Sequence, residues 1–213
     1  VGCWKVSKNL QKELKEEMET IGEAEKSDRI VVLDAGHGGT DSGKVGINGV
    51  KEKDINLTIT NSVKKILEKE NIQVIMTRET DEQLAQSKVE DLKYRVSLMN
   101  EKKPSLAVSI HQNSYHEENV FGAQVFYYKT STEGEKAAAV IQEALQEVNP
   151  ENTKKIKAND TYYLLKKTEV PTVIVECGFL SNYAEAEKLV SEDYQKKLAE
   201  AVTKGILQYL KDQ

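Results

Sequence analysis

Cysteine, proline and long apolar runs are all scarce in this sequence. Its 213 residues include two cysteines, Cys3 and Cys177, and three prolines. Two cysteines are too few for a disulfide framework, and no apolar run approaches the roughly 18 residues of a membrane-spanning helix. We therefore expect a chain that folds around an ordinary hydrophobic core. A length of 213 residues suits one α/β domain better than two.

A surplus of positive charge is also missing. The 30 lysines and arginines are outnumbered by 35 aspartates and glutamates, so the formal net charge is -5. The basic residues are scattered along the chain and form no cluster that would attract a phosphate backbone. We therefore expect no nucleic acid partner.

The first 28 residues differ in composition from the rest of the chain. Lysine and glutamate dominate them, and their apolar residues from Leu10 to Ile21 are spaced by four, four and three. This spacing indicates a helix with a narrow apolar stripe. We interpret residues 1–28 as a charged helical extension or spacer, with a partner-binding helix as the alternative, and residues 29–213 as the main domain.

Short β-branched runs alternate with segments of helical period throughout the main domain. Strands are predicted over residues 30–34, 72–76, 105–110, 123–128, 161–165 and 172–176. Helical periodicity covers residues 55–67, 87–99, 140–148 and 198–210. Continuously apolar strands that are joined through helices predict a parallel sheet with both faces covered. The expected fold is three-layer α/β, with a mostly parallel central sheet of about six strands and helices on both faces.

Reactive side chains follow three of the predicted strands. His37 comes soon after the first strand, His111 directly follows "SLAVSI", and Glu176 ends the strand "TVIVE". The carboxyl ends of parallel strands meet at one edge of a sheet, so we expect these side chains to lie close together. Glu52 begins the next helix after the His37 loop and returns to the same edge.

The loop around His37 is unusually rich in glycine. Glycines at positions 36, 38 and 39 let the backbone turn sharply around the imidazole. Two imidazoles and a carboxylate, with a fourth position free, are typical ligands of a catalytic zinc ion. The candidate ligands are therefore His37, Glu52 and His111, and a structural histidine held by hydrogen bonds is the alternative for either imidazole.

Other interpretations of the same residues are open at this point. The loop "GGTDSGKV" is one residue away from a phosphate-binding loop, but Val45 lacks the hydroxyl that would bind magnesium. Cys177 follows Glu176 and suggests a cysteine hydrolase, although strand alternation turns it to the opposite face. His116 is a possible further ligand in a polar loop, where an exposed histidine is the more common case. For Glu176 the alternative role is a buried salt bridge with Arg78 or Arg95.

Four motifs, in this order, resemble the zinc-dependent N-acetylmuramoyl-L-alanine amidases, the type 3 amidases of peptidoglycan. They are "VVLDAGHGGTDSG", Glu52 within "GVKEKDINL", "SIHQNS" and "VIVECGFLSN", and the similarity extends from about Arg29 to Leu210. The segments "QSKVEDLKYRVSLMN", "AQVFYY" and "KGILQYL" are most similar to the germination-specific amidases of spore formers. Those enzymes prepare the muramic δ-lactam of the spore cortex.

The resemblance implies a role for each candidate residue. His37, Glu52 and His111 would hold one zinc ion, and Glu176 would be the catalytic carboxylate. The implied reaction is hydrolysis of the amide between N-acetylmuramic acid and the L-alanine of the stem peptide. A general vegetative wall amidase and a catalytically idle wall-binding domain of the same fold are the alternatives.

Two further residues are assigned weaker roles. Asp41 and Asn113 are candidates for orienting the histidines or contacting substrate, although such residues in glycine-rich loops are often turn formers. Gln112 and Ser114 stand where many family members have other residues, so they are candidates for the rim of the substrate site.

The resemblance also implies where the protein acts and with what. Peptidoglycan is the expected partner, and no nucleotide is expected. The chain begins with Val1 rather than methionine, and we expect secretion or membrane anchoring through a segment upstream, with the forespore intermembrane space as one location. No inhibitory helical insertion is expected between His111 and Glu176, so control in cis by such a helix is not expected. No appended wall-binding repeat is present in the sequence, so we expect localisation through the upstream segment or through an activating or localising protein partner.

Overall fold

A computed structural model describes residues 29–213 of the chain, and the helix expected within residues 1–28 lies outside that range. The described part contains a six-stranded sheet in the order β2-β1-β3-β6-β4-β5. The strands are β1 (Ile30–Ala35), β2 (Gln73–Met76), β3 (Leu106–Asn113), β4 (Gln124–Tyr128), β5 (Lys157–Asn159) and β6 (Thr172–Phe179). The helices are α2 (Glu52–Lys69), α3 (Lys88–Lys102), α4 (Thr132–Val148), α5 (Tyr163–Lys167), α6 (Tyr183–Leu189) and α7 (Glu192–Lys211).

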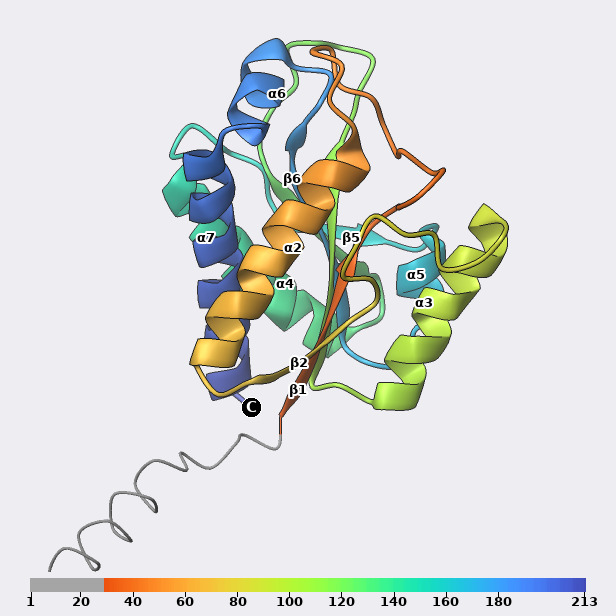
Figure 1. Cartoon of the computed structure of the whole chain (residues 1–213). Helices are drawn as coiled ribbons and strands as arrows, with labels where there is room; N and C mark the ends of the chain where they lie inside the picture. Colours follow the sequence, from red (N-terminus) through yellow and green to blue (C-terminus); the bar gives the residue numbers. More distant parts are fainter. Residues whose placement is uncertain (1–28) are drawn as a thin grey trace, which may run out of the picture.

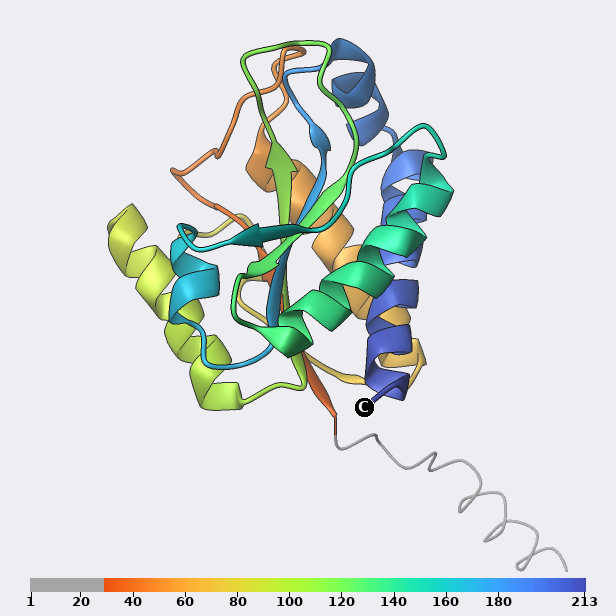
Figure 2. The same ribbon diagram turned by 180° about the vertical axis from the view of Figure 1, so that it is seen from behind.

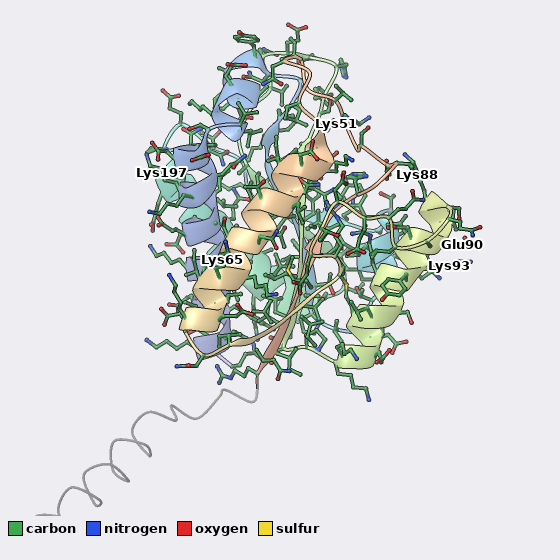
Figure 3. The ribbon with its side chains drawn as sticks, in the orientation of Figure 1. Lys51, Lys65, Lys88, Glu90, Lys93 and Lys197 are labelled. Carbon is green, nitrogen blue, oxygen red and sulfur yellow. The ribbon has the colours of Figure 1, made fainter. Side chains whose placement is uncertain are left out.

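The sheet is mostly parallel and lies between two layers of helices. β2, β1, β3 and β6 run in one direction, while β4 is antiparallel to β6 and parallel to β5. Helices α2, α4 and α7 cover one face and α3 and α5 cover the other (Figures 1 and 2). Lysines such as Lys65 on α2 and Lys197 on α7 are exposed on the outer surface of their layer (Figure 3). The predicted fold class is confirmed. Within residues 29–213 no helix has the length and apolar character needed to span a bilayer.

Strand alternation divides the core into a larger and a smaller part. The larger cluster lies between the sheet and α2, α4 and α7, and includes Leu33, Ile110 and Val175. The smaller cluster lies on the α3 and α5 side and includes Val32 and Ile174. On the α3 and α5 side, the face of the sheet becomes polar toward the carboxyl ends of the parallel strands. This polar half of the face borders the cavity described below.

One predicted strand is wrong. Residues 161–165 form a turn and the start of α5, and the edge strand β5 lies earlier, at Lys157–Asn159. The side chain of Asn159 accepts hydrogen bonds from the backbone N–H groups of Thr161 (2.9 Å) and Tyr162 (2.7 Å), and these bonds turn the chain away from the sheet. An apolar run of five residues does not distinguish a strand from a short buried helix. The short helix α6 was not predicted either.

A network centred on Asp34 fixes the loop after β1. Asp34 is fully buried and accepts hydrogen bonds from Arg95 (2.5 Å), Ser109 (2.5 Å) and Thr77 (2.6 Å). Arg95 also donates to the carbonyl oxygen of Ala35 (2.8 Å) and to that of His37 (2.8 Å). The network therefore ties the end of β1 and the backbone of His37 to helix α3.

A second buried arginine holds the same loop from the other side. Arg78 donates to the carbonyl oxygens of Ala35 (2.8 Å), Gly36 (3.1 Å) and Lys53 (2.9 Å). A buried carbonyl group without a hydrogen bond is costly. Arg78 thus supplies hydrogen bonds to backbone carbonyl groups where the chain leaves β1 and where α2 begins.

We predict that Asp34→Asn lowers the free energy of unfolding by about 3 kcal/mol, because it removes the carboxylate of a fully buried ion pair and leaves Arg95 with Asp91 as its remaining carboxylate partner. The control Glu79→Gln removes an exposed ion pair with Lys64 and is expected to cost less than about 1 kcal/mol. Denaturant unfolding of the parent and both variants at neutral pH measures these free energies. Equal losses of unfolding free energy in the two variants would contradict the prediction.

The contribution of the Asp34–Arg95 pair to the free energy of unfolding should also depend on pH. Burial acts to raise the pKa of Asp34, but the charge of Arg95 and the hydrogen bonds from Ser109 and Thr77 outweigh burial and lower the pKa from 3.8 to about 2. A group whose pKa is lowered by folding stabilises the fold above its unfolded pKa and loses that contribution as pH falls through its folded pKa. The gap between parent and Asp34→Asn should therefore narrow from about pH 4 toward pH 2.

Candidate metal centre

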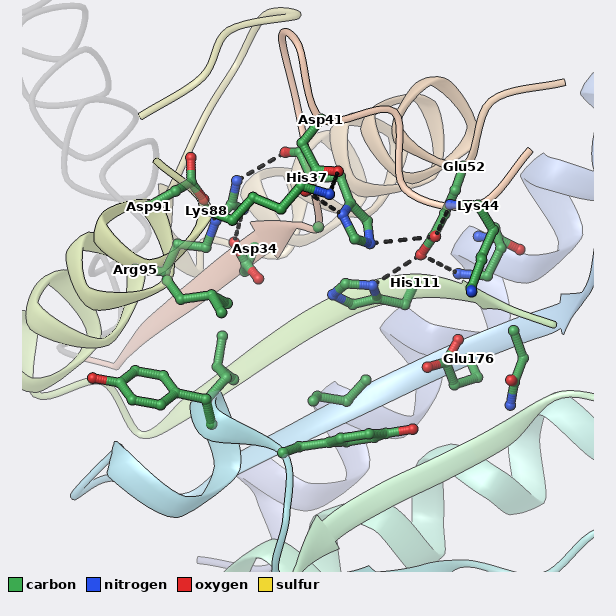
Figure 4. A pocket seen from close by; sticks show the side chains of 18 of the residues that line it. Asp34, His37, Asp41, Lys44, Glu52, Lys88, Asp91, Arg95, His111 and Glu176 are labelled. Atoms are coloured by element: carbon green, nitrogen blue, oxygen red, sulfur yellow. Dashed lines mark hydrogen bonds and ion pairs between the residues drawn. The ribbon is translucent and has the colours of Figure 1, made fainter. Parts of the chain in front are cut away.

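His37, Glu52 and His111 converge at the carboxyl end of the sheet. His37 lies in the loop after β1, Glu52 is the first residue of α2, and His111 lies near the end of β3. One ligand atom from each lies within 4.8 Å of the others. Glu52 Oε2 is 3.3 Å from His37 Nε2, and Glu52 Oε1 is 2.9 Å from His111 Nδ1. Figure 4 shows the three side chains pointing toward one another.

Two glycines make room for this cluster. A Cβ atom at Gly36 would lie 2.2 Å from His111 Cε1, and one at Gly43 would lie 2.5 Å from Glu52 Oε2. Gly43 also has a backbone φ of 66°, and His37 has a φ of 64°. Both values lie in the left-handed region, which residues other than glycine rarely adopt. The glycine-rich sequence is therefore required both by close packing against the ligand atoms and by backbone conformation.

Glu52 is a buried anion between two imidazoles. Glu52 is 2% exposed. Its carboxylate also accepts hydrogen bonds from the backbone N–H groups of Lys44 (2.8 Å) and Gln112 (3.1 Å). Burial acts to raise the pKa of Glu52, but the hydrogen bonds and charges of His111 and His37 hold that pKa far below its usual range. Burial acts to lower the pKa of His111, but the hydrogen bond and charge of Glu52 outweigh burial and raise this pKa to about 9. The cluster thus contains a buried, negatively charged carboxylate that a bound cation would stabilise.

The donor atoms suit a zinc ion. Imidazole nitrogens and a carboxylate are typical zinc ligands, and one ligand atom from each of the three residues lies within 4.8 Å of the others. Asp41 Oδ2 lies 2.8 Å from His37 Nδ1, so Nε2 is the nitrogen of His37 that faces Glu52. A carboxylate on the second nitrogen is a common way of orienting a metal-binding histidine. These residues fit a zinc site, and metal binding by them stays a prediction.

Glu176 is a separate carboxylate beside this cluster. It lies on β6 opposite His111 in the register of the two strands, and it points into the same cavity (Figure 4). Its Oε2 atom is buried and has no hydrogen-bond partner within residues 29–213. Burial, assisted by the charge of Glu52, raises the pKa of Glu176 to about 7. The alternative salt bridge is not formed, because Arg78 and Arg95 bind the Asp34 network and backbone carbonyl groups instead.

A cavity of about 490 Å³ contains these groups. Its lining includes His37, Glu52, His111 and Glu176, together with Tyr162 from the segment before α5. The sequence does not indicate Tyr162 as a site residue, because it predicts a strand over residues 161–165 and shows no motif there.

The two competing chemistries are not supported by the geometry. Cys177 is fully buried in the larger core cluster on the face opposite Glu176, and burial raises the pKa of its thiol to about 12. The "GGTDSGKV" loop wraps around Glu52: the backbone N–H of Lys44 donates to that carboxylate, and Val45 pairs with Lys51. Helix α2 begins only at Glu52, so this loop does not lead into a helix as a phosphate-binding loop does.

The remaining candidates lie in different places. Asn113 borders the cavity, but its side chain accepts a hydrogen bond from the backbone N–H of Ser114 (2.8 Å), as a turn former does. The Gln112 residue is 2% exposed, and its amide donates to Asn56 rather than lying open on the rim. The side chain of His116 is 73% exposed next to Glu117, and His116 is not part of the cluster.

Comparison with known proteins agrees with this geometry. A family described as N-acetylmuramoyl-L-alanine amidase matches residues 31–208. The germination-specific N-acetylmuramoyl-L-alanine amidase of Bacillus subtilis (strain 168) is 40% identical over 191 residues, which cover 86% of this chain and 80% of that protein.

Solved structures give the same result. The CwlD amidase of Clostridioides difficile, determined in complex with the GerS lipoprotein, is 37% identical with a TM-score of 0.84, and the match covers 87% of this chain and 100% of that one. The catalytic domain of the amidase CwlV from Bacillus (Paenibacillus) polymyxa var. colistinus is 32% identical with a TM-score of 0.78, over 87% of this chain and 99% of that one.

Proposed function

Because this chain belongs to the N-acetylmuramoyl-L-alanine amidase family, we propose that it is a zinc-dependent peptidoglycan hydrolase. It cleaves the amide that joins the lactyl group of N-acetylmuramic acid to the L-alanine of the stem peptide. The observation that carries the proposal is the placement of Glu176, a buried carboxylate with an unpartnered oxygen, in one cavity with His37, Glu52 and His111.

The three clustered residues hold the metal, and Asp41 keeps His37 in position. A zinc ion, when bound, supplies Lewis-acid polarisation of the scissile carbonyl and lowers the pKa of water from about 15.7 to about 7. The chain contributes the buried negative charge of Glu52, which matches a divalent cation. Asp41 accepts from His37 Nδ1 (2.8 Å) and is itself paired with Lys88 (2.7 Å).

Glu176 moves the protons. Hydrolysis adds the oxygen of water to the acyl carbon, breaks the carbon–nitrogen bond and delivers a proton to the leaving amine. The unpartnered Oε2 of Glu176 accepts the proton from water and passes it to the nitrogen of L-alanine, as a general acid–base group does. No arginine or lysine is paired with Glu176 in the described part of the chain, so no salt bridge competes for this oxygen.

The biological setting is proposed from the relatives. The 40% identical relative in Bacillus subtilis is named a germination-specific amidase, and this supports a role in forming the muramic δ-lactam of the spore cortex. A general vegetative wall amidase is the alternative. The related CwlD amidase was solved with the GerS lipoprotein, so an activating or localising protein partner is also proposed. Peptidoglycan lies outside the cytoplasm, and the protein acts there.

The two glutamates provide the test of the chemistry. Glu52→Gln removes the anionic ligand, so zinc affinity should fall steeply, and activity should fall with it and partly recover in excess zinc. Glu176→Gln leaves all three ligands in place. It should bind zinc like the parent but lose roughly 10²- to 10⁴-fold in kcat, the usual contribution of general acid–base catalysis.

Zinc content and turnover are measured on both variants and on the exposed control Glu79→Gln, which should match the parent in both. If Glu176→Gln emptied the site while Glu52→Gln stayed loaded, the ligand and the base would be exchanged. Full activity in both variants would rule out the zinc hydrolase.

The spore role has its own test. In a spore former that carries this gene, a deletion strain should make cortex that lacks muramic δ-lactam, while the vegetative wall is unchanged. Mass analysis of muropeptides from purified spores measures this. A normal δ-lactam content, with altered vegetative muropeptides, would favour the vegetative alternative.

A further inference from the structure

The sheet order places Tyr162 on the far side of Glu176 from the metal cluster. Across the sheet, β1, β3, β6 and β4 are neighbours in that order. They carry, respectively, the His37 loop, His111, Glu176 and Phe126. Phe126 is the register partner of Ile174, which lies on the same face of β6 as Glu176 because it is two residues away. Tyr162 packs on the ring of Phe126, with 5.5 Å between ring centroids.

The ring of Tyr162 is held from two directions. Its backbone N–H donates to Asn159 Oδ1 (2.7 Å), and α5 begins at the next residue, with Leu164 and Leu165 buried in the smaller core cluster. Phe126 is itself 4% exposed and supports the ring from below. The position of Tyr162 is therefore fixed by the fold before any substrate binds.

Within residues 29–213 no group hydrogen-bonds to the hydroxyl of Tyr162. The residue is 37% exposed and lines the cavity. Burial, and then the negative charges of Glu176 and Glu52, raise the pKa of Tyr162. The phenol is therefore neutral and can donate a hydrogen bond into the cavity that it lines together with Glu176.

We propose that Tyr162 contacts the substrate and donates its O–H to the acyl oxygen of the scissile amide, an assignment that rests on the proposed function. A peptide amide offers one acceptor, its oxygen, and one donor, its N–H. The proton needed by the nitrogen comes from Glu176. The acyl oxygen has two lone pairs, so the phenol can donate to it while zinc, when bound, polarises it. Negative charge develops on that oxygen as water adds to the acyl carbon, and a donor fixed in advance stabilises such charge.

Tyr162→Phe tests this assignment, because it removes only the hydroxyl and keeps the ring that packs on Phe126. With soluble muramoyl peptides as substrate and zinc present, kcat should fall roughly 10²- to 10³-fold, the usual cost of one such donor. KM should stay within about threefold, because the bond strengthens as the transition state forms. Zinc content and thermal stability should equal those of the parent.

The matched control is Tyr128→Phe. Tyr128 packs against the same smaller core cluster but does not line the cavity, so loss of its hydroxyl should change kcat by less than about threefold. A kcat within threefold of the parent for Tyr162→Phe would overturn the proposal. A rise in KM without loss of kcat would also overturn it, since that result indicates contact with a part of the substrate that does not react.

Failure of the underlying function gives a different result. If the zinc-loaded parent protein released no peptide that begins with L-alanine, the proposed amidase activity would be wrong and the role of Tyr162 would fall with it. If the parent is active and Tyr162→Phe is equally active, only the role of Tyr162 is wrong.

Discussion

The burial of one carboxylate, Glu52, is the constraint on which the site depends. An ionised carboxylate away from water is costly unless charges or hydrogen bonds compensate it. Two imidazoles and two backbone N–H groups surround it. Each comes from a segment that must approach closely: the loop after β1, the end of β3, and the turn before α2. Positions 36 and 43 require glycine, because any side chain there would clash with His111 or Glu52. The fold thus places a buried negative charge, which favours binding of a cation, at one edge of the sheet.

The Asp34 network makes that placement possible. The end of β1 turns away from the sheet, and its carbonyl groups would lose their partners without the guanidinium groups of Arg95 and Arg78. Asp34 lies under this loop and neutralises Arg95 in a fully buried pair. The same face of the sheet is apolar farther back, where α3 and α5 cover it. The cavity lies where the cover ends and the polar residues begin, at the carboxyl ends of parallel strands, as is usual in open α/β sheets.

Much of this site could be predicted from the sequence, because three reactive residues lie at or just beyond the end of an apolar run that forms a strand. Parallel topology alone then brings His37, His111 and Glu176 to one edge, and the structure has them there. Other features have no local signal. The turn that makes residues 161–165 a helix start depends on the side chain of Asn159, and Tyr162 reaches the cavity only through that turn. The partners of Arg78 and Arg95 are backbone carbonyl groups, which no motif records.

Digestion of purified peptidoglycan is the most direct test of the central claim, which is that this edge of the sheet is a zinc amidase centre. Mass analysis should find stem peptides that begin with a free L-alanine amine, together with glycan strands whose muramic acid has lost its peptide. Treatment with a chelator should abolish the release, and added zinc should restore it. Cleavage between sugars or within the stem peptide, or undiminished release by protein shown to be free of metal, would contradict the account.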